Sequence, residues 1–174
     1  MRIYRTRIAP TATEVLSTLI KKGLIEVVPE SREEALKDLE SVLNEYSRMD
    51  REINDTAKDM VSKRGLEYSS IGRIKRSLAK ERNFGIDDES LDYIVSQMIE
   101  IMMSSGHVDE VYGEDHELNK AIAPVMRKIM SMEEELDKEV RQKIKHLEDA
   151  EGTMNWEIEY QRKKDELERL KRLK

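Results

Sequence analysis

Cysteine is absent from the 174 residues, so the chain can form neither disulfide bonds nor thiolate metal sites. Proline and glycine are scarce, with three and seven copies, and no stretch alternates apolar and polar residues long enough for a sheet. No apolar run approaches the roughly 20 residues of a membrane span, and the N-terminus lacks the apolar segment of a signal peptide. We therefore expect a cytoplasmic protein that makes no contact with a membrane.

Charged residues make up 39% of the chain and apolar ones 38%. Glu, Lys, Arg, Leu and Met dominate, as they do in long helices and coiled coils, so we expect an all-α fold. The charge content also fits the ion-pair networks of a thermophile, whereas ten methionines point the other way. Capping boxes at residues 11–14 and 31–34 and apolar stripes predict six helices: residues 11–22, 31 to beyond 60, 70–83 with Gly85 ending it, 87–106, 115 to beyond 147, and one after 153 that folds back antiparallel. The inward stripes include Leu39, Leu43, Tyr46 and Ile53 on the second helix and Ile71, Ile74, Leu78 and Ala79 on the third.

The chain matches itself when it is shifted by 83 residues. Gly23 then meets Gly106, Leu39 meets Ile122 and Met49 meets Met132 without a gap. Two amphipathic helices in phase would give part of this match, but the match also crosses the glycine connector. We predict two duplicated units, each a short helix, a Gly, an extended link and a long helix. Together with a C-terminal helix they would form an elongated, branched (Y-like) helical bundle.

Charge divides the chain into a basic unit, 1–84, and an acidic unit, 85–174. Their formal charges are about +3 and −9 within a total of −6. The basic side chains are candidates for binding the phosphates of DNA or RNA. They are Arg2, Arg5, Arg7, Lys21, Lys22, Arg73, Lys75, Arg76, Lys80 and Arg82. The alternative is a solvated helix face, or one that pairs with the acidic unit within or between molecules.

Two of the three histidines lie in an acidic segment that suggests a metal site. His107, Asp109 and His116 are the candidate ligands. The two histidines are nine residues apart, not four apart on one helix face as in a zinc-protease helix. The acidic residues would also satisfy free N–H groups where the following helix begins. We expect no cofactor, and any cation would bind weakly.

Signatures of enzyme active sites are missing from the sequence. No glycine-rich phosphate loop is present, and no serine sits in a nucleophile elbow. Six methionines lie at helical spacing and suggest either an adaptable binding surface or core packing. They are Met98, Met102, Met103, Met126, Met130 and Met132.

Several segments resemble the DUF507 family, a bacterial family of uncharacterised proteins. They are RIYRTRIA at the start, ERNFGIDDESLDYIVSQMIE, SSGHVDEVYGEDHELNKAI, and EEELDKEVRQKIKHLEDAEGTMNWEIEYQ near the end. The stretches HVDEV and WEIEY are the most specific parts of this resemblance, which covers nearly the whole chain. The resemblance implies a bacterial, cytoplasmic, helical protein, and it supplies no activity and no catalytic residues.

We therefore expect a non-enzymatic binding protein whose basic N-terminal half contacts DNA or RNA. The alternative is a protein-interaction scaffold or adaptor that uses the acidic, methionine-rich C-terminal half to bind a protein partner. The sequence leaves the oligomeric state open.

Overall fold

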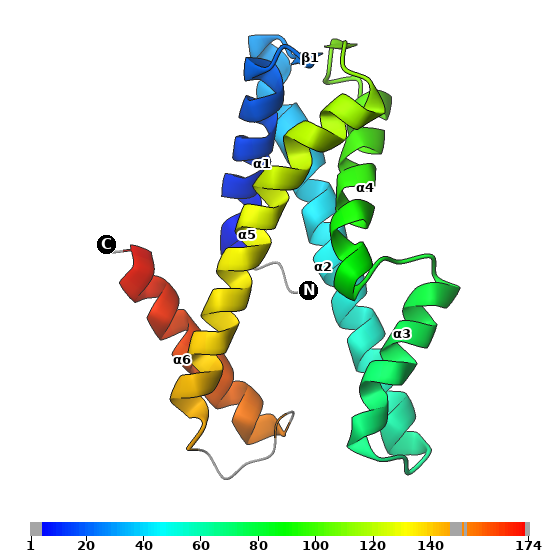
Figure 1. Ribbon diagram of the computed structural model, residues 1–174, viewed down its shortest axis with the longest axis vertical. Helices are drawn as coiled ribbons and strands as arrows, with labels where there is room; N and C mark the ends of the chain where they lie inside the picture. Colours follow the sequence, from blue (N-terminus) through cyan, green and yellow to red (C-terminus); the bar gives the residue numbers. More distant parts are fainter. Residues whose placement is uncertain (1–4, 147–150, 152, 173–174) are drawn as a thin grey trace. The chain divides into compact units, whose positions relative to one another are not determined.

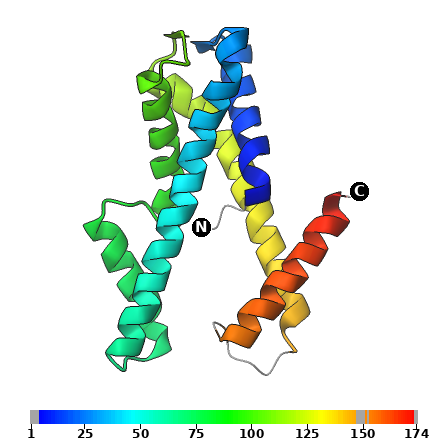
Figure 2. The ribbon, with the colours of Figure 1, turned by 180° about the vertical axis from the view of Figure 1, so that it is seen from behind.

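The computed structural model describes residues 5–146, 151 and 153–172 (Figures 1 and 2). The chain divides into two compact units, Met1–Lys128 and Ile129–Lys174. The boundary predicted between residues 84 and 85 falls inside the first unit, where residues on both sides share one core. The all-α helical bundle is confirmed, while the predicted branched outline stays a prediction. None of the helices among the described residues is long and apolar enough to cross a membrane.

The two predicted repeats have the same order of elements. The first is α1 (Arg5–Lys21), β1 (Ile25–Glu26) and α2 (Arg32–Lys63), and the second is α4 (Ser90–Ser104), β2 (Glu110–Val111) and α5 (Asp115–Ile144). The shift of 83 residues carries the last residue of α1 onto the last residue of α4, and the first residue of α2 onto the first residue of α5. The repeats therefore agree in structure at the helix ends that flank their extended links.

The extended links of the two repeats pair with each other. Ile25 lies opposite Val111 and Glu26 opposite Glu110 in an antiparallel pair. The pairing continues outward, since the N–H of Asp109 donates to the carbonyl of Glu26 at 2.9 Å. Because equivalent segments meet in opposite directions, the two links are related by an approximate two-fold axis where they pair.

The core of the first unit lies between α1, α2, α4 and the first half of α5. Figures 1 and 2 show α1 and α4 on either side of α2. The stripe predicted on the long helix is buried there at Leu39, Leu43, Tyr46 and Ile53. Burying each such side chain contributes about 1.5–3 kcal/mol. Met98, Met102 and Met126 are buried in this core as well, so they form no binding surface.

The helix α3 (Ile71–Glu81) folds back along the C-terminal half of α2. Gly65 permits the turn between the two helices because it adopts a left-handed conformation, with φ of 61°. The helix ends at Glu81, and Asn83 then takes a φ of 51°. The prediction that Gly85 ends this helix is wrong, because Asn83 also tolerates the left-handed conformation and reverses the chain first.

Both predicted capping boxes are wrong in their details. The first helix begins at Arg5 and runs through Pro10, and the Thr11 hydroxyl donates to the carbonyl of Arg7 at 2.6 Å instead of capping a helix start. Burial of Ile8 stabilises the extra turn, which offsets the hydrogen bond that proline cannot make. Ser31 does precede α2, but its side chain makes no capping bond. A 3₁₀ turn at Pro29–Ser31 leads directly into the helix.

In the second unit, residues 129–144 of α5 pack against α6 (Met154–Arg172) around Leu136, Val140, Ile144, Tyr160 and Leu167. The helices run antiparallel, as predicted, and the Tyr160 hydroxyl donates to Asp137. The guanidinium of Arg141 lies 5.4 Å from the centre of the Trp156 ring, a distance typical of a cation–π contact. The helix α5 ends at Ile144 and not beyond Leu147, which lies outside the described residues.

Candidate functional site

The helix α3 separates its cations between two faces. Ile71, Ile74, Leu78 and Ala79, which the sequence predicts to point inward, are buried or half-buried. Arg73, Arg76 and Lys80 are exposed, and their spacing of three and four residues places them on the opposite face. The seven residue steps from Arg73 to Lys80 rise about 10 Å along the helix, which equals about three base-pair steps of a duplex.

The other two candidate cations of this helix hold α3 against α2. The Lys75 Nζ lies 2.7 Å from the Asp50 Oδ1, and the exposed fractions of these side chains are 20% and 9%. The guanidinium of Arg82 donates to Glu52 at 2.7 Å, and Glu52 also accepts from Arg48. Lys75 and Arg82 were predicted to bind nucleic acid, but in the structure their charged groups are occupied by these carboxylates.

The link between Glu52 and Arg82 makes stability depend on pH. The hydrogen bond from Arg82 lowers the pKa of Glu52 below its ordinary value of 4.5, and Arg48 lowers the pKa of Glu45 in the same way. A carboxyl group with a depressed folded-state pKa contributes stability above its unfolded pKa, and this contribution is lost as pH falls through the folded pKa. We expect the free energy of unfolding to decrease below about pH 4.5.

The variant Glu52→Gln should lose part of this acid dependence. Urea unfolding followed by circular dichroism at several pH values between about 3 and 7 would measure it. The matched control is Glu81→Gln, because Glu81 is exposed on α3 and lies outside this network. Equal acid slopes for Glu52→Gln and the wild type would contradict the assignment.

The N-terminal candidate cations lie elsewhere. Arg2 is outside the described residues, Arg5 begins α1, and Arg7 is half-buried in its first turn. Lys21 and Lys22 are exposed at the other end of α1, beside β1. The helix α3 lies at the far end of α2 (Figure 1), whose 32 residues span about 48 Å. The structure therefore does not bring Lys21 and Lys22 together with the cations of α3.

The turn between α2 and α3 carries further exposed apolar and cationic groups. Leu66 and Tyr68 have exposed fractions of 40% and 53%. Among the described residues, Arg64, Arg73 and Lys80 form no ion pair, and Arg76 reaches Asp87 only at 3.9 Å. We call this set the hairpin surface: Arg64, Leu66, Tyr68, Arg73, Arg76 and Lys80. It combines cations with an aromatic ring, the groups that bind phosphates and stack on bases.

The three candidate metal ligands have separate partners. The Nδ1 of His107 lies 2.9 Å from the Asp38 carboxylate, Asp109 accepts from the N–H of Val28 at 2.7 Å, and His116 lies 3.3 Å from Glu114. Across the residues that the structure describes, no three His, Asp or Glu side chains form a group suited to a metal ion. The structure therefore does not assemble His107, Asp109 and His116 into one site.

Asp38, Ser105 and His107 contain the residue types of a catalytic triad but not its geometry. The Ser105 hydroxyl and the His107 Nδ1 both contact the same oxygen of Asp38. In a triad, the serine instead contacts the ring nitrogen that faces away from the carboxylate. This cluster ties α2 to the loop after α4. Sequence reasoning missed it because Asp38 and His107 are 69 residues apart.

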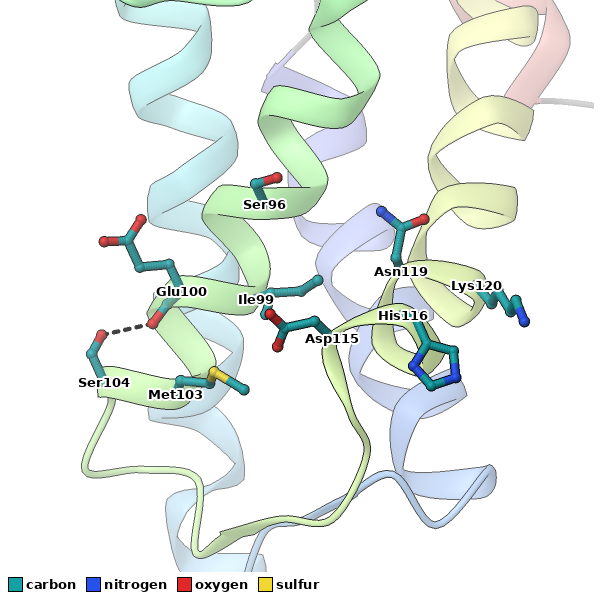
Figure 3. A pocket seen from close by; sticks show the side chains of 9 residues that line it. All are labelled: Ser96, Ile99, Glu100, Met103, Ser104, Asp115, His116, Asn119 and Lys120. Carbon is teal, nitrogen blue, oxygen red and sulfur yellow. Dashed lines mark hydrogen bonds between the residues drawn. The ribbon is translucent and has the colours of Figure 1, made fainter.

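A groove lies between α4 and α5, within the first unit (Figure 3). Its volume is about 780 Å³, and its lining residues are Ser96, Ile99, Glu100, Met103 and Ser104 from α4, with Asp115, His116, Asn119 and Lys120 from α5. Met103 has an exposed fraction of 54%. The repeat alignment could have indicated the groove, because Asn119 stands where the first repeat has Leu36.

The model of a family described as a protein of unknown function, DUF507, matches residues 1–172. No curated protein matches the chain.

Proposed function

We propose that this chain, which belongs to the DUF507 family of unknown function, binds nucleic acid through the hairpin surface. The observation that carries the proposal is the exposed row of Arg73, Arg76 and Lys80 on α3, with the exposed ring of Tyr68 in the turn that precedes this helix. Cations in such a row neutralise phosphates and release counterions. Such contacts read no base edges, so the binding is salt-sensitive and weakly specific for sequence.

The inward face of α3 supports this role because it fixes the row in place. The ion pair of Lys75 and Asp50 and the bond from Arg82 to Glu52 hold α3 on α2. The exposed cations therefore lie on a helix whose position is already fixed before binding, which reduces the conformational entropy lost when nucleic acid binds. Tyr68, in the 3₁₀ turn that precedes α3, has an exposed ring on which an unpaired base could stack.

The alternative, a protein scaffold that uses the acidic, methionine-rich half, has less support. Three of its six methionines are buried in the core of the first unit, and buried side chains provide no contact area for a partner. The exposed Met103 lines the groove between α4 and α5, which is smaller than the methionine-rich surface that the sequence suggests.

A charge-reversal pair tests the proposal. We expect Arg73→Glu with Lys80→Glu to lower the affinity for short single-stranded and duplex probes at least about tenfold at about 50 mM salt, because two phosphate contacts become repulsive. Fluorescence anisotropy with labelled DNA and RNA of the same sequence measures the affinity. The affinity should also depend less on salt: the slope of the logarithm of the binding constant against the logarithm of the salt concentration should become shallower by about two.

The matched control is Lys21→Glu with Lys22→Glu, which changes the net charge by the same amount at the other end of the first unit. It should retain most of the affinity if the hairpin surface is the site. Equal losses in the two variants would show a response to net charge only. Absence of binding by the wild type at micromolar concentration would refute the proposal.

A further inference from the structure

The groove between α4 and α5 has a counterpart in the first repeat that is closed. The repeat alignment pairs Asn119 with Leu36, and Met103 with Ile20. Leu36 and Ile20 both pack against the core, whereas Met103 remains exposed and Asn119 lines the groove. In the second repeat, the amide side chain of Asn119 stands in place of the leucine that would cover Met103. The second repeat therefore keeps an apolar surface open that the first repeat fills with its own side chain.

Carboxylates border this apolar surface. Glu100 and Asp115 line the groove together with Ile99 and Met103 (Figure 3), and Lys120 is the one lysine or arginine in the lining. The exposed carboxylates of Glu114, just before α5, and Glu117, in its first turn, lie next to Asp115 in the chain. A molecule that binds this groove would carry large apolar side chains with cations next to them. The apolar side chains would cover Ile99 and Met103, and the cations would pair with the bordering carboxylates.

We call Leu66 and Tyr68, in the turn between α2 and α3, the hairpin tip. We infer that the groove receives the hairpin tip of a second copy of this chain. Leu66 and Tyr68 would enter between Ile99 and Met103, and the hairpin cations would face Glu100 and Asp115. The hairpin tip joins the exposed side chains of Leu66 and Tyr68 to cations of which only Arg76 has a carboxylate within 4 Å among the described residues, that of Asp87 at 3.9 Å. Unlike charges on the two surfaces steer the encounter and set its register.

The hairpin tip cannot reach the groove of its own chain. Asp38 of α2 contacts the loop that follows the groove residues of α4, and the tip begins where α2 ends at Lys63. The 25 residues between these positions separate the tip from the groove by about 40 Å along a continuous helix. The pairing therefore joins two molecules, and each copy contributes one tip and one groove.

Light scattering after size-exclusion chromatography tests the pairing. At about 50 mM salt and rising protein concentration, the mass should increase from that of one chain, 20.4 kDa, to at least twice that value. At about 500 mM salt it should return to one chain, because exposed charge pairs are screened. A mass that stays at one chain at every concentration in low salt would overturn the inference.

Two charge-reversed variants make the test specific. Arg73→Glu with Lys80→Glu gives a negative tip beside a negative groove, and Glu100→Lys with Asp115→Lys gives a positive groove beside a positive tip. Each variant alone should remain a single chain, whereas an equal mixture should associate again because tip and groove have exchanged signs. If association persists in the separate variants, or if the mixture fails to restore it while both variants remain folded by circular dichroism, the inference is wrong.

A third variant closes the groove without changing its charge. Asn119→Leu restores the side chain that the first repeat uses, so it should cover Met103 and prevent association while leaving the hairpin surface intact. The same variant should bind nucleic acid as the wild type does. Failure of self-association is therefore distinguishable from failure of nucleic-acid binding. Unchanged association of Asn119→Leu would show that the groove is not the contact.

Discussion

Replacing Asp50 with alanine is expected to lower the free energy of unfolding by about 3 kcal/mol, because the cation of Lys75 would lose its partner at a mostly buried position. The two charged atoms lie 2.7 Å apart, and the carboxylate side chain has an exposed fraction of 9%. Urea unfolding at pH 7 measures the loss. It is a large part of the roughly 5–15 kcal/mol that stabilises a typical protein.

An exposed ion pair supplies the matched control. Asp59 accepts from Lys63 on the same helix at 2.7 Å, with both side chains mostly exposed, and Asp59→Ala should lower stability by less than about 1 kcal/mol. Replacing both Asp50 and Lys75 with leucine should recover most of the loss, since no buried charge is left unpaired. Equal effects of Asp50→Ala and Asp59→Ala would show that burial does not strengthen the pair.

Gly85→Ala is expected to lower stability by about 3 kcal/mol, through overpacking. An added Cβ would lie 2.5 Å from the Cβ of Tyr93 and 2.7 Å from the backbone oxygen of Glu89. Neither atom is the end of a flexible side chain, so the backbone must move. The move would disturb the packed rings of Tyr46, Phe84 and Tyr93 and the bond that the Tyr46 hydroxyl donates to the Gly85 carbonyl.

Gly72→Ala provides the comparison, because it makes the same chemical change where there is space. Gly72 lies in α3, and an added Cβ there meets no atom within 4 Å. Alanine favours the helical conformation over glycine, so this variant should gain about 0.5–1 kcal/mol. Thermal unfolding of both variants by circular dichroism would show shifts of opposite sign. A gain of stability in Gly85→Ala would contradict the packing described around Gly85.

The sequence predicts the helices well because their apolar stripes are long and their period is regular. The stripe from Leu39 to Ile53 is buried as predicted, and the repeat match locates the start of α5 at Asp115. The errors fall at helix ends. Residues such as Thr11 and Gly85 favour a particular helix end locally, but burial in the folded core also decides where a helix begins and ends. A short stretch of sequence does not show which of its side chains the fold buries.

The candidate site could be predicted only in part. Charge in the sequence identifies α3 as the basic helix, and the helical period separates Arg73 and Lys80 from the inward positions. It does not show that Asp50 neutralises Lys75, because 25 residues separate them in the chain and the turn at Gly65 brings them together. The charge pattern also grouped Lys21 and Lys22 with the cations of α3, because charge counted along a sequence does not show how far apart the side chains lie in space. The groove follows from differences between the repeats such as Asn119 for Leu36, which the repeat alignment contains and the hydrophobic period alone does not.

The antiparallel pairing of the two extended links affects how the chain acquires its fold during synthesis. Each strand residue pairs with one that the ribosome adds more than 80 positions later. Until Leu118, Ile122 and Met126 emerge, the inner face of the first repeat lacks part of its cover. At about 5–20 residues per second, this delay lasts several seconds. Nascent chains halted after α3 should therefore be more sensitive to protease, and recruit chaperones more readily, than those halted after residue 128.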